Sequence, residues 1–438
     1  MRYKRNITSS FITQIIRIIT GFAVSILVAR VLGPEGQGHI AYLMLFFGLL
    51  ASYGHLGIVN AIVYFQKRSE FSEEEVFKVN LTYILIVSTV IGITMIALRY
   101  FGIIFTEYSI AIVVGGALFI FFSFINEAMR NFYIGTEDVY LSNRYILLGF
   151  FTKLVLVIVF WIAGILTVGT YVLILVLMTG ISSVFLFFKF RMKFSLKWNN
   201  ILLKKEFAFG IISFLIILLN YLNYRADQFM IEYFLDKSEL GLYSIGVQLA
   251  ELVFIIPVSL SSAFYAKIIN IPIEDTKSIN EITATTLKLA IYGCLALVLG
   301  GIFASYLIPF VYGQDFSGSI LAAQILFASV LFASIGKIVF PYYSSQNKHR
   351  FYLISTFISF ILNIIINLFL IPIFGIAGAA IASLISYAIF GLVPLCVLIL
   401  KNKIPLKSIL LFNKKDWQTA KDMINKILKR QGSSNNTK

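Results

Sequence analysis

"RVLGPEGQGHIAYLM" (30–44) sets six residues rich in glycine and proline, "GPEGQG" (33–38), between two long apolar runs. Glycine reaches backbone conformations that other residues avoid, and proline fixes its own φ angle, so this segment favours a tight turn. A phosphate-binding loop would need a Gly-Lys-Ser/Thr sequence after a strand, and the segment has neither feature. We therefore predict that residues 33–38 join two successive membrane-crossing helices.

The chain as a whole has the composition of a protein that crosses a membrane many times. Of its 438 residues, 59% are hydrophobic and 13% are charged, and the mean hydropathy is +0.89. Soluble chains carry about 25% charged residues, and a membrane-spanning helix needs roughly 20 apolar residues. The expected fold is an all-α polytopic bundle of twelve spans, at residues 7–31, 39–65, 79–104, 109–133, 143–164, 167–189, 207–234, 241–267, 284–312, 318–343, 351–372 and 376–400.

The first turn recurs in the second half of the chain. "VLGPEGQGHIAY" (31–42) follows the first span and "FLDKSELGLYSI" (234–245) follows the seventh. Leu32 matches Leu235, and Gly38 matches Gly241, at the same offset of 203 residues. Each half starts on the same side of the membrane, so we expect two parallel six-helix repeats about an axis along the membrane normal.

This repeat predicts four parts. They are an N-terminal six-helix bundle (1–190), a basic cytoplasmic linker (191–206), a C-terminal six-helix bundle (207–400) and a basic cytoplasmic tail (401–438). Within the tail, residues 413–431 have the pattern of an amphipathic basic helix, which would lie on the inner leaflet or dock a partner protein.

The distribution of positive charge predicts the orientation. With both termini placed in the cytoplasm, most of the 36 lysines and arginines fall on the inner side, as the positive-inside rule requires. The outer side holds only Arg30, Arg99 and Lys237. The net charge of +15 therefore follows the inner loops and does not indicate nucleic acid binding.

The sequence gives no sign of a cofactor. Cys294 and Cys396 lie far apart in apolar runs, and the three histidines are scattered, so neither a disulfide nor a metal centre is expected. The chain has no nucleotide-binding motif, which excludes ATP hydrolysis by this chain.

Three stretches resemble one protein family. They are "LVARVLGPEGQGHIAY" (27–42), "NYRADQFMIEYFLDKSELGLYSIGVQLAEL" (223–252) and "LFLIPIFGIAGAAIASLISY" (368–387). Together with the two repeats, they resemble the Wzx-type polysaccharide flippases of the multidrug/oligosaccharidyl-lipid/polysaccharide (MOP) exporter superfamily, over residues 1–400. The resemblance implies alternating-access export of an undecaprenyl-diphosphate-linked oligosaccharide, such as an O-antigen or capsule unit, to the outer leaflet of the bacterial cytoplasmic membrane. A polysaccharide polymerase complex is a candidate partner.

Four cations lie inside predicted spans: Arg17, Lys153, Arg225 and Lys337. A charge at mid-bilayer costs about 2.5–3.5 kcal/mol, so such residues commonly face a wet cavity. A guanidinium pairs bidentately with phosphate oxygens, and we predict that these four bind the diphosphate. The alternatives are structural pairing for the arginines and snorkelling to the inner surface for the two lysines.

Polar residues on two helices are candidates for cavity lining and ion coupling. In the seventh span, Asp227 shares one helix side with three polar residues, Asn220, Asn223 and Tyr224, and Arg225 faces another side. In the eighth span, Glu251 lies one turn from Gln248. Glu251 would bind a coupling proton or sodium ion, or it would pair with Arg225 or Lys337.

Three further residues have mainly structural interpretations. Glu127 and Arg130 stand at helical i,i+3 spacing and predict a local salt bridge. His55 lies between Gly54 and Gly57, which predict a bend; it is expected to be a hydrogen-bonded packing residue, with pH sensing as the alternative.

The leading prediction is a flippase, and two other classes remain to be weighed. A multidrug-type drug or cation antiporter would need an acidic site, whereas Arg17 and Lys153 make the first half basic. A membrane glycosyltransferase or polymerase would need a large outer loop, and the predicted outer loops are short. The outward step of an anionic headgroup is favoured by about 2.3 kcal/mol per charge per 100 mV. We expect a cation returning through Asp227 or Glu251, driven by a proton or sodium gradient, to reset the carrier.

Overall fold

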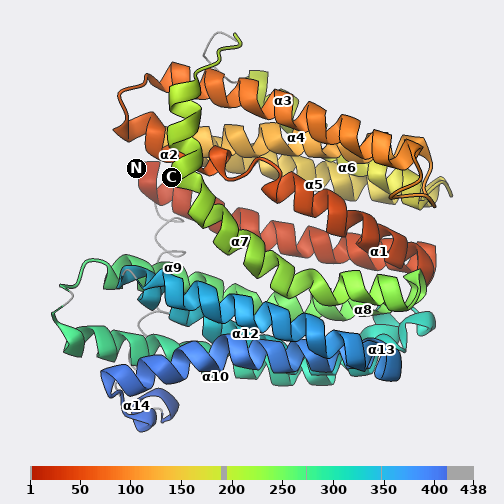
Figure 1. The fold of residues 1–438 in the computed structure, drawn as a ribbon. Coiled ribbons are helices and arrows are strands. Elements are labelled where there is room, and N and C mark those ends of the chain that lie inside the picture. The colour runs from red at the N-terminus through yellow and green to blue at the C-terminus, as the bar shows by residue number, and fades with distance from the viewer. Residues whose placement is uncertain (1, 189–194, 273, 347, 412–438) are drawn as a thin grey trace, which may run out of the picture. The chain divides into compact units, whose positions relative to one another are not determined.

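The computed structural model describes residues 2–188, 195–272, 274–346 and 348–411, and within these ranges all regular structure is helical (Figure 1). The predicted tail helix (413–431) lies outside the described residues. The longer helices are α1 (Arg2–Tyr53), α2 (Ile58–Arg68), α3 (Glu73–Tyr100), α4 (Ile110–Gly135), α5 (Val139–Ile162), α6 (Val168–Phe188), α7 (Asn200–Phe234), α8 (Lys237–Ala250), α9 (Ile255–Ile268), α10 (Thr276–Ala304), α12 (Ser319–Ser345) and α13 (His349–Asn402). Short helical turns are η1 (Glu251–Phe254), η2 (Ser305–Leu307), α11 (Ile308–Tyr312), η3 (Gln314–Phe316) and α14 (Leu406–Leu410).

A turn at the predicted position is confirmed, but it is confined to Gly33, and residues 34–38 are helical. Helix α1 is broken at Gly33, whose φ of 68° and ψ of −176° lie in a region that glycine reaches without the strain of a Cβ atom. Pro34 follows as the first residue of the second segment, a position where its missing N–H leaves no hydrogen bond unmade. In Figure 1 the chain runs from the N-terminus to the far end of α1 and returns toward α2.

Side-chain contacts at the two ends of this path confirm the reversal. Asn6 Nδ2 donates to the backbone oxygen of Glu137, 2.8 Å away, just after α4 ends. Gln66, in α2, packs its carboxamide against Gly135 at the end of the same helix, so closely that a Cβ there would lie 2.0 Å from Gln66 Oε1. Residues 6 and 66 therefore lie at one end of the bundle.

Helix α13 contains a second reversal, at Gly375 (φ 57°, ψ −140°). Ser359 Oγ donates to the backbone oxygen of Ser386 at 2.7 Å, although 27 positions separate them in the chain. In one straight helix that separation would be about 40 Å. Asn363 Nδ2 also donates to Ser386 Oγ, at 2.9 Å, so buried polar side chains join the two segments.

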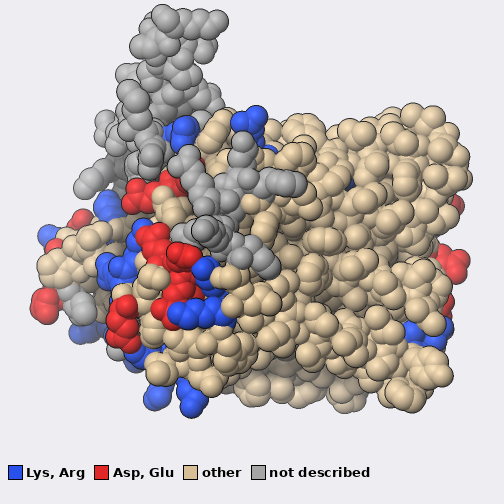
Figure 2. All heavy atoms as spheres, turned by 90° about the horizontal axis from the view of Figure 1, so that it is seen from above, with Lys and Arg blue, Asp and Glu red and all other residues tan. Residues whose placement is uncertain are grey.

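The structure is that of a membrane protein. Nine helices among the described residues are long and apolar enough to cross a bilayer. The two longest, Ile12–Arg68 and Arg350–Asn402, have 57 and 53 residues, and each contains one of the two reversals. In Figure 2 lysine, arginine, aspartate and glutamate side chains gather mainly at the two ends of the helices, and a broad uncharged band lies between them. Twelve crossings and cytoplasmic termini remain predictions.

The chain forms two compact units. Unit 1 contains Met1–Ser244 and Pro309–Ser317, and unit 2 contains Ile245–Ile308 and Gly318–Lys438. Unit 1 thus includes α7 and the first half of α8, which belong by sequence to the second repeat. The predicted division at residues 191–206 remains a prediction.

Helix α7 packs antiparallel to the second segment of α1 and to α2 within unit 1. Near the start of α7, a Cβ on Gly210 would lie 2.6 Å from the backbone oxygen of Gly57. Farther along, Tyr221 O–H donates to the backbone oxygen of Leu45 at 3.1 Å. From Gly210 to Tyr221 the residue numbers rise along α7, whereas those of their contacts fall from Gly57 to Leu45. The two helices therefore run side by side in opposite directions.

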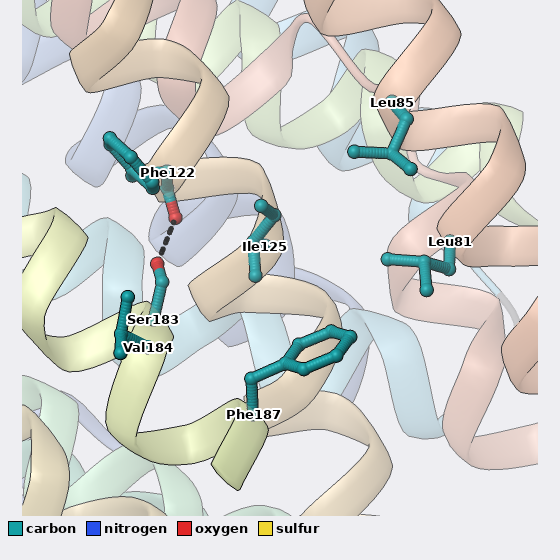
Figure 3. Close-up of a pocket in the computed structure, with 7 residues that line it drawn as sticks. All are labelled: Leu81, Leu85, Phe122, Ile125, Ser183, Val184 and Phe187. Carbon is teal, nitrogen blue, oxygen red and sulfur yellow. Dashed lines mark hydrogen bonds between the residues drawn. The ribbon is translucent and has the colours of Figure 1, made fainter. Parts of the chain in front are cut away.

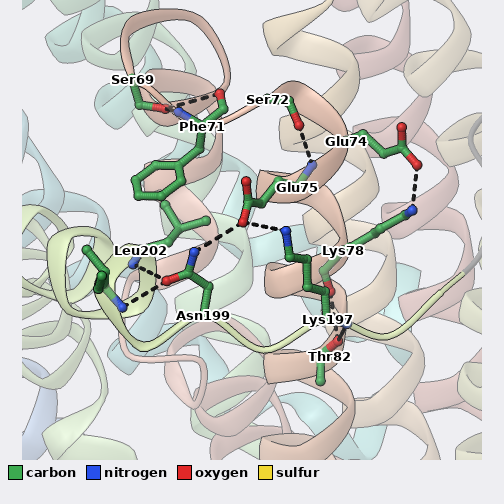
Figure 4. Close-up of polar contacts among 11 residues, drawn as sticks. Ser69, Phe71, Ser72, Glu74, Glu75, Lys78, Thr82, Lys197, Asn199 and Leu202 are labelled. Carbon is green, nitrogen blue, oxygen red and sulfur yellow. Dashed lines mark hydrogen bonds and ion pairs between the residues drawn. The ribbon is translucent and has the colours of Figure 1, made fainter.

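Polar contacts fasten the start of α7 to α3 (Figure 4). Glu75 accepts hydrogen bonds from Lys197 Nζ at 2.7 Å and from Asn199 Nδ2 at 3.1 Å. Asn199 Oδ1 also accepts from the backbone N–H groups of Ile201 and Leu202, which caps α7. The residues before α7 are therefore held against α3 by an ion pair and a hydrogen bond, and Asn199 caps α7.

Candidate functional site

Unit 1 contains a polar cavity of about 380 Å³ between α4, α5 and α6 and the end of α1. Polar groups at membrane depth are costly, and a cavity that gathers several of them is a functional-site candidate. Its polar lining residues are Ser52, Ser123, Asn126, Glu127, Arg130, Thr179 and Ser182.

Glu127 links this cavity to two basic side chains. Arg130 Nη2 donates to Glu127 Oε1 at 3.3 Å, which confirms the predicted i,i+3 salt bridge. The other oxygen, Oε2, lies 3.4 Å from His55 Nε2. The side chain of His55 is 1% exposed, whereas that of Glu127 is 23% exposed, so the carboxylate lies between the interior and the cavity.

The hydrogen bonds of His55 assign its tautomer. The backbone N–H of Gly57 donates to His55 Nδ1 at 3.2 Å, so Nδ1 is the unprotonated nitrogen. The ring hydrogen is then on Nε2, which faces Glu127. Residues 54–57 form a turn between α1 and α2, and Gly57 has a left-handed φ of 78°, so the predicted bend and packing role are confirmed.

Two of the predicted phosphate ligands lie in the same region of unit 1. Arg17, on the first segment of α1, has an exposed side chain within electrostatic range of Arg130. Arg225, on α7, is half-buried, and both Arg225 and Glu127 lie within electrostatic range of the Tyr53 hydroxyl. Of the three arginines, Arg130 is the one that lines the cavity and donates to Glu127.

The two predicted lysine ligands lie on aromatic rings. Lys153 Nζ, on α5, is 5.1 Å from the ring centre of Tyr171 in the first turn of α6. Lys337 Nζ, on α12 in unit 2, is 4.4 Å from the ring centre of Phe254. Phe254 ends the turn η1, which begins at Glu251. Cation–π contacts of this kind stabilise a cation where water is scarce.

The polar stripe predicted on α7 is largely buried. Asp227 is 1% exposed; its Oδ2 accepts from Tyr243 O–H at 2.5 Å, and its Oδ1 accepts from the backbone N–H of Gln228 at 2.8 Å. Asp227 therefore ties α7 to α8, and its carboxylate is closed to solvent in this structure.

The other members of the predicted polar set vary in burial. Asn223 is fully buried, Tyr224 is half-buried, and Asn220 Nδ2 donates to the backbone oxygen of Ile216 at 2.9 Å within α7. Gln248 is half-buried on α8, in the part of that helix that belongs to unit 2. Their roles at a transport site remain proposals.

A larger cavity, of about 460 Å³, lies between α3, α4 and α6 and has an apolar lining (Figure 3). Its one hydroxyl, on Ser183, donates to the backbone oxygen of Phe122 at 3.1 Å and so holds α6 against α4. Among its described lining residues, the cavity offers no free polar group for a charged or sugar-bearing substrate. We therefore place the candidate site in the smaller, polar cavity.

Ser123 and Asn126 were not predicted as cavity residues from the sequence, and Glu127 and Arg130 were predicted only as a local salt bridge. These four residues recur at helical spacing on one face of α4, and this signal could have identified the face. Nothing in the local sequence of Ser52 or Thr179 could have placed them opposite that face. Among the described residues, no group of histidine, cysteine, aspartate and glutamate side chains could hold a metal ion.

The fold of the protein is similar to that of membrane transporters of the MOP superfamily. The structure is similar to the lipid II flippase MurJ in an inward closed conformation, with a TM-score of 0.74 and 18% identity over 96% of each chain. It is also similar to an inward-facing multidrug resistance MATE family transporter of that superfamily, with a TM-score of 0.72 and 17% identity over 88% of this chain and 94% of that one. An outward-facing conformation of a multidrug resistance MATE family transporter is similar with a TM-score of 0.65 and 17% identity, over 92% of this chain and 95% of that one.

The chain belongs to the polysaccharide biosynthesis protein family, whose sequence profile matches residues 27–321. A comparison with curated protein sequences gives no match.

Proposed function

We propose that this protein is a flippase that moves an undecaprenyl-diphosphate-linked oligosaccharide from the inner to the outer leaflet of the bacterial cytoplasmic membrane. The oligosaccharide would be an O-antigen, a capsule unit or a related precursor of a cell-surface polysaccharide. Membership of the polysaccharide biosynthesis family and the fold similarity to a lipid II flippase support this proposal.

The observation that carries the proposal is a cavity in an otherwise apolar bundle that is lined by Arg130 together with hydroxyl and amide side chains. Arg17, which is within electrostatic range of Arg130, and Arg225 would complete the phosphate site. A diphosphate bears two or more negative charges, and guanidinium groups bind phosphate oxygens in pairs. Hydroxyl and amide side chains such as Ser123 and Asn126 suit the hydroxyls of a sugar. The polyprenyl tail can stay in the bilayer while the headgroup crosses.

Alternating access supplies the path, and the membrane potential supplies part of the driving force. As the two repeats rock, the headgroup site would open first to one side and then to the other. Outward movement of an anion from a negative cytoplasm is favourable by about 2.3 kcal/mol per charge per 100 mV. A proton or sodium ion returning through Asp227 or Glu251 would reset the empty carrier, and Lys153 and Lys337 would complete the basic path.

A MATE-like drug or cation antiporter is the second candidate. The fold similarity to a MATE family transporter favours it, and so does the Glu127 carboxylate beside the cavity. Arg130, which pairs with that carboxylate, would repel an amine drug, which is why we place this candidate second. A polysaccharide polymerase complex remains a proposed partner of the flippase.

The test uses purified protein in proteoliposomes with controlled orientation. We expect the wild type to move a fluorescent undecaprenyl-diphosphate oligosaccharide between leaflets, and to leave an amine dye such as ethidium on its original side. Collapse of the proton and sodium gradients, one at a time, then identifies the coupling ion. Dye transport without lipid movement would exclude the flippase in favour of the antiporter, and lipid movement that survives both collapses would exclude cation coupling.

A further inference from the structure

The first turns of the two repeats touch through glycine at the end of the bundle away from residue 6. A Cβ atom on Gly38 would lie 1.6 Å from the backbone oxygen of Lys237, and a Cβ atom on Gly241 would lie 1.9 Å from the backbone oxygen of Pro34. Real Cβ atoms essentially never approach another atom within 3.0 Å. Because backbone meets backbone on both sides, only glycine fits at positions 38 and 241.

This contact is reciprocal under the sequence repeat. The offset of 203 residues that matches Gly38 to Gly241 also matches Pro34 to Lys237. Exchanging the two repeats therefore converts the first contact into the second, which is the property of a contact on a two-fold axis. All four residues belong to unit 1.

The side chain of Lys237 reinforces the same contact. Its Nζ lies 4.0 Å from the ring centre of Tyr42 and 3.5 Å from Glu107 Oε1, and it forms an ion pair with Glu232. The lysine side chain is 11% exposed. One residue thus fastens the second segment of α1, the loop between α3 and α4, and the end of α7, while its backbone oxygen faces Gly38.

A second layer of polar contacts surrounds Lys237. His39 Nδ1 and the Tyr108 hydroxyl are 2.9 Å apart, and the rings of Tyr108 and Tyr42 stack with centres 5.9 Å apart. Gln37 Nε2 donates to Ser244 Oγ at 3.3 Å, which joins the first turn to α8. These contacts are exposed or half-buried hydrogen bonds and ion pairs, which water can replace when the helices separate.

We propose that the reciprocal Gly38–Gly241 contact, together with Lys237, Glu107 and Glu232, is a latch that closes this end of the transporter and must open in each transport cycle. The first turns meet on the two-fold axis along the membrane normal, at one end of the bundle. Repeats that rock against each other to open that end must therefore separate or slide at this contact. A backbone contact without side chains can separate without leaving a cavity, and the ion pairs of Lys237 set how readily it does so. The role in transport rests on the proposed function, whereas the latch itself can be measured without substrate.

The test measures the opening of the latch by the reactivity of a cysteine placed beside it. In a background with Cys294→Ser and Cys396→Ser, Ser244→Cys places a thiol beside the contact. The rate of its reaction with a small hydrophilic maleimide is measured in detergent micelles, where both ends are accessible. We expect Lys237→Met to raise the rate at least about fivefold and Lys237→Arg to leave it near the parent value. Lys67→Met, which removes an ion pair with Glu73 at the opposite end, should leave the rate unchanged.

Gly38→Ala is the second variant, and its added methyl group should hold the contact open and raise the rate further. Gel filtration and thermal unfolding identify variants that have not folded. If Gly38→Ala does not fold, the reaction rate of the Lys237→Met variant alone tests the latch. A rate that stays at the parent value in folded Lys237→Met protein would overturn the latch. Because this readout contains no lipid substrate, a failed flipping assay would count against the proposed function and not against the latch.

Discussion

Replacing Glu206 with glutamine should stabilise the protein more as the pH rises. Glu206 is fully buried one residue before the predicted span 207–234, and its Oε1 accepts one hydrogen bond, from Asn80 Nδ2 at 2.7 Å. Asn80 is itself fully buried and also donates to the backbone oxygen of Val76 at 2.9 Å. Burial raises the pKa of Glu206 from 4.5 to about 8, since a desolvated carboxylate is unfavourable.

The raised pKa of Glu206 determines how the stability of the protein changes with pH. The folded protein keeps a proton on Glu206 that the unfolded chain releases above pH 4.5, so the stability that this carboxyl contributes falls as the pH rises toward 8. One pKa unit corresponds to about 1.4 kcal/mol, which makes the cost of the buried carboxylate at most about 5 kcal/mol. Relaxation around the charge reduces this, and we expect about 2–3 kcal/mol at pH 9.

The assay compares apparent melting temperatures in detergent micelles at pH 4.5 and pH 9. Glu206→Gln should melt within about a degree of the wild type at pH 4.5, where the cost has hardly begun, and several degrees above it at pH 9. The matched control is Glu70→Gln, at an exposed carboxylate that pairs with Lys205, for which no gain at high pH is expected. An equal difference between Glu206→Gln and wild type at both pH values would refute the assignment of a buried proton to Glu206.

Three further predictions concern the packing of unit 1 and the cavity. Gly57→Ala should destabilise the protein by about 2–4 kcal/mol in thermal unfolding, because the new Cβ atom would lie 2.9 Å from the backbone oxygen of Gly210 and the residue has a φ of +78°. Gly21→Ala is the control and should leave the stability nearly unchanged, because no atom lies within 4 Å of the added Cβ. Tyr243→Phe should cost about 1–3 kcal/mol by removing the O–H donor of buried Asp227, and an unchanged melting temperature would count against that hydrogen bond. Glu127→Gln should leave folding intact but slow flipping, because a neutral amide cannot form the ion pair that holds Arg130 at the cavity; flipping at the wild-type rate would exclude a positioning role for Glu127.

The reversals of the chain could be predicted from the sequence because they are local. Gly33 and Pro34 need backbone conformations that few residues adopt, so their letters alone mark the turn. The bend at Gly54 to Gly57 was predicted for the same reason. Span lengths are likewise fixed by apolar runs, although the number of crossings also depends on the course of the chain after each turn.

The contacts of the site could not be predicted, because they join residues distant in the chain. His55 and Glu127 meet across 72 positions, and Asn80 and Glu206 across 126. Hydrophobic periodicity assigns a residue to a face but does not say which helix covers that face. Packing also explains why Asp227 does not face a cavity as predicted: its carboxylate is buried and accepts a hydrogen bond from the hydroxyl of Tyr243.

The most direct test of the central claim is the rate of outward movement of a fluorescent undecaprenyl-diphosphate oligosaccharide in proteoliposomes containing Arg17→Ala or Arg225→Ala protein. Arg68→Ala is the matched control, since Arg68 is exposed at the C-terminal end of α2 and is not part of the cavity lining. The account predicts that flipping falls at least about tenfold in both folded arginine variants, since a charged hydrogen bond contributes about 1.5–3 kcal/mol, and stays normal in the control. Flipping at the wild-type rate in both arginine variants would contradict the claim that these arginines hold the diphosphate.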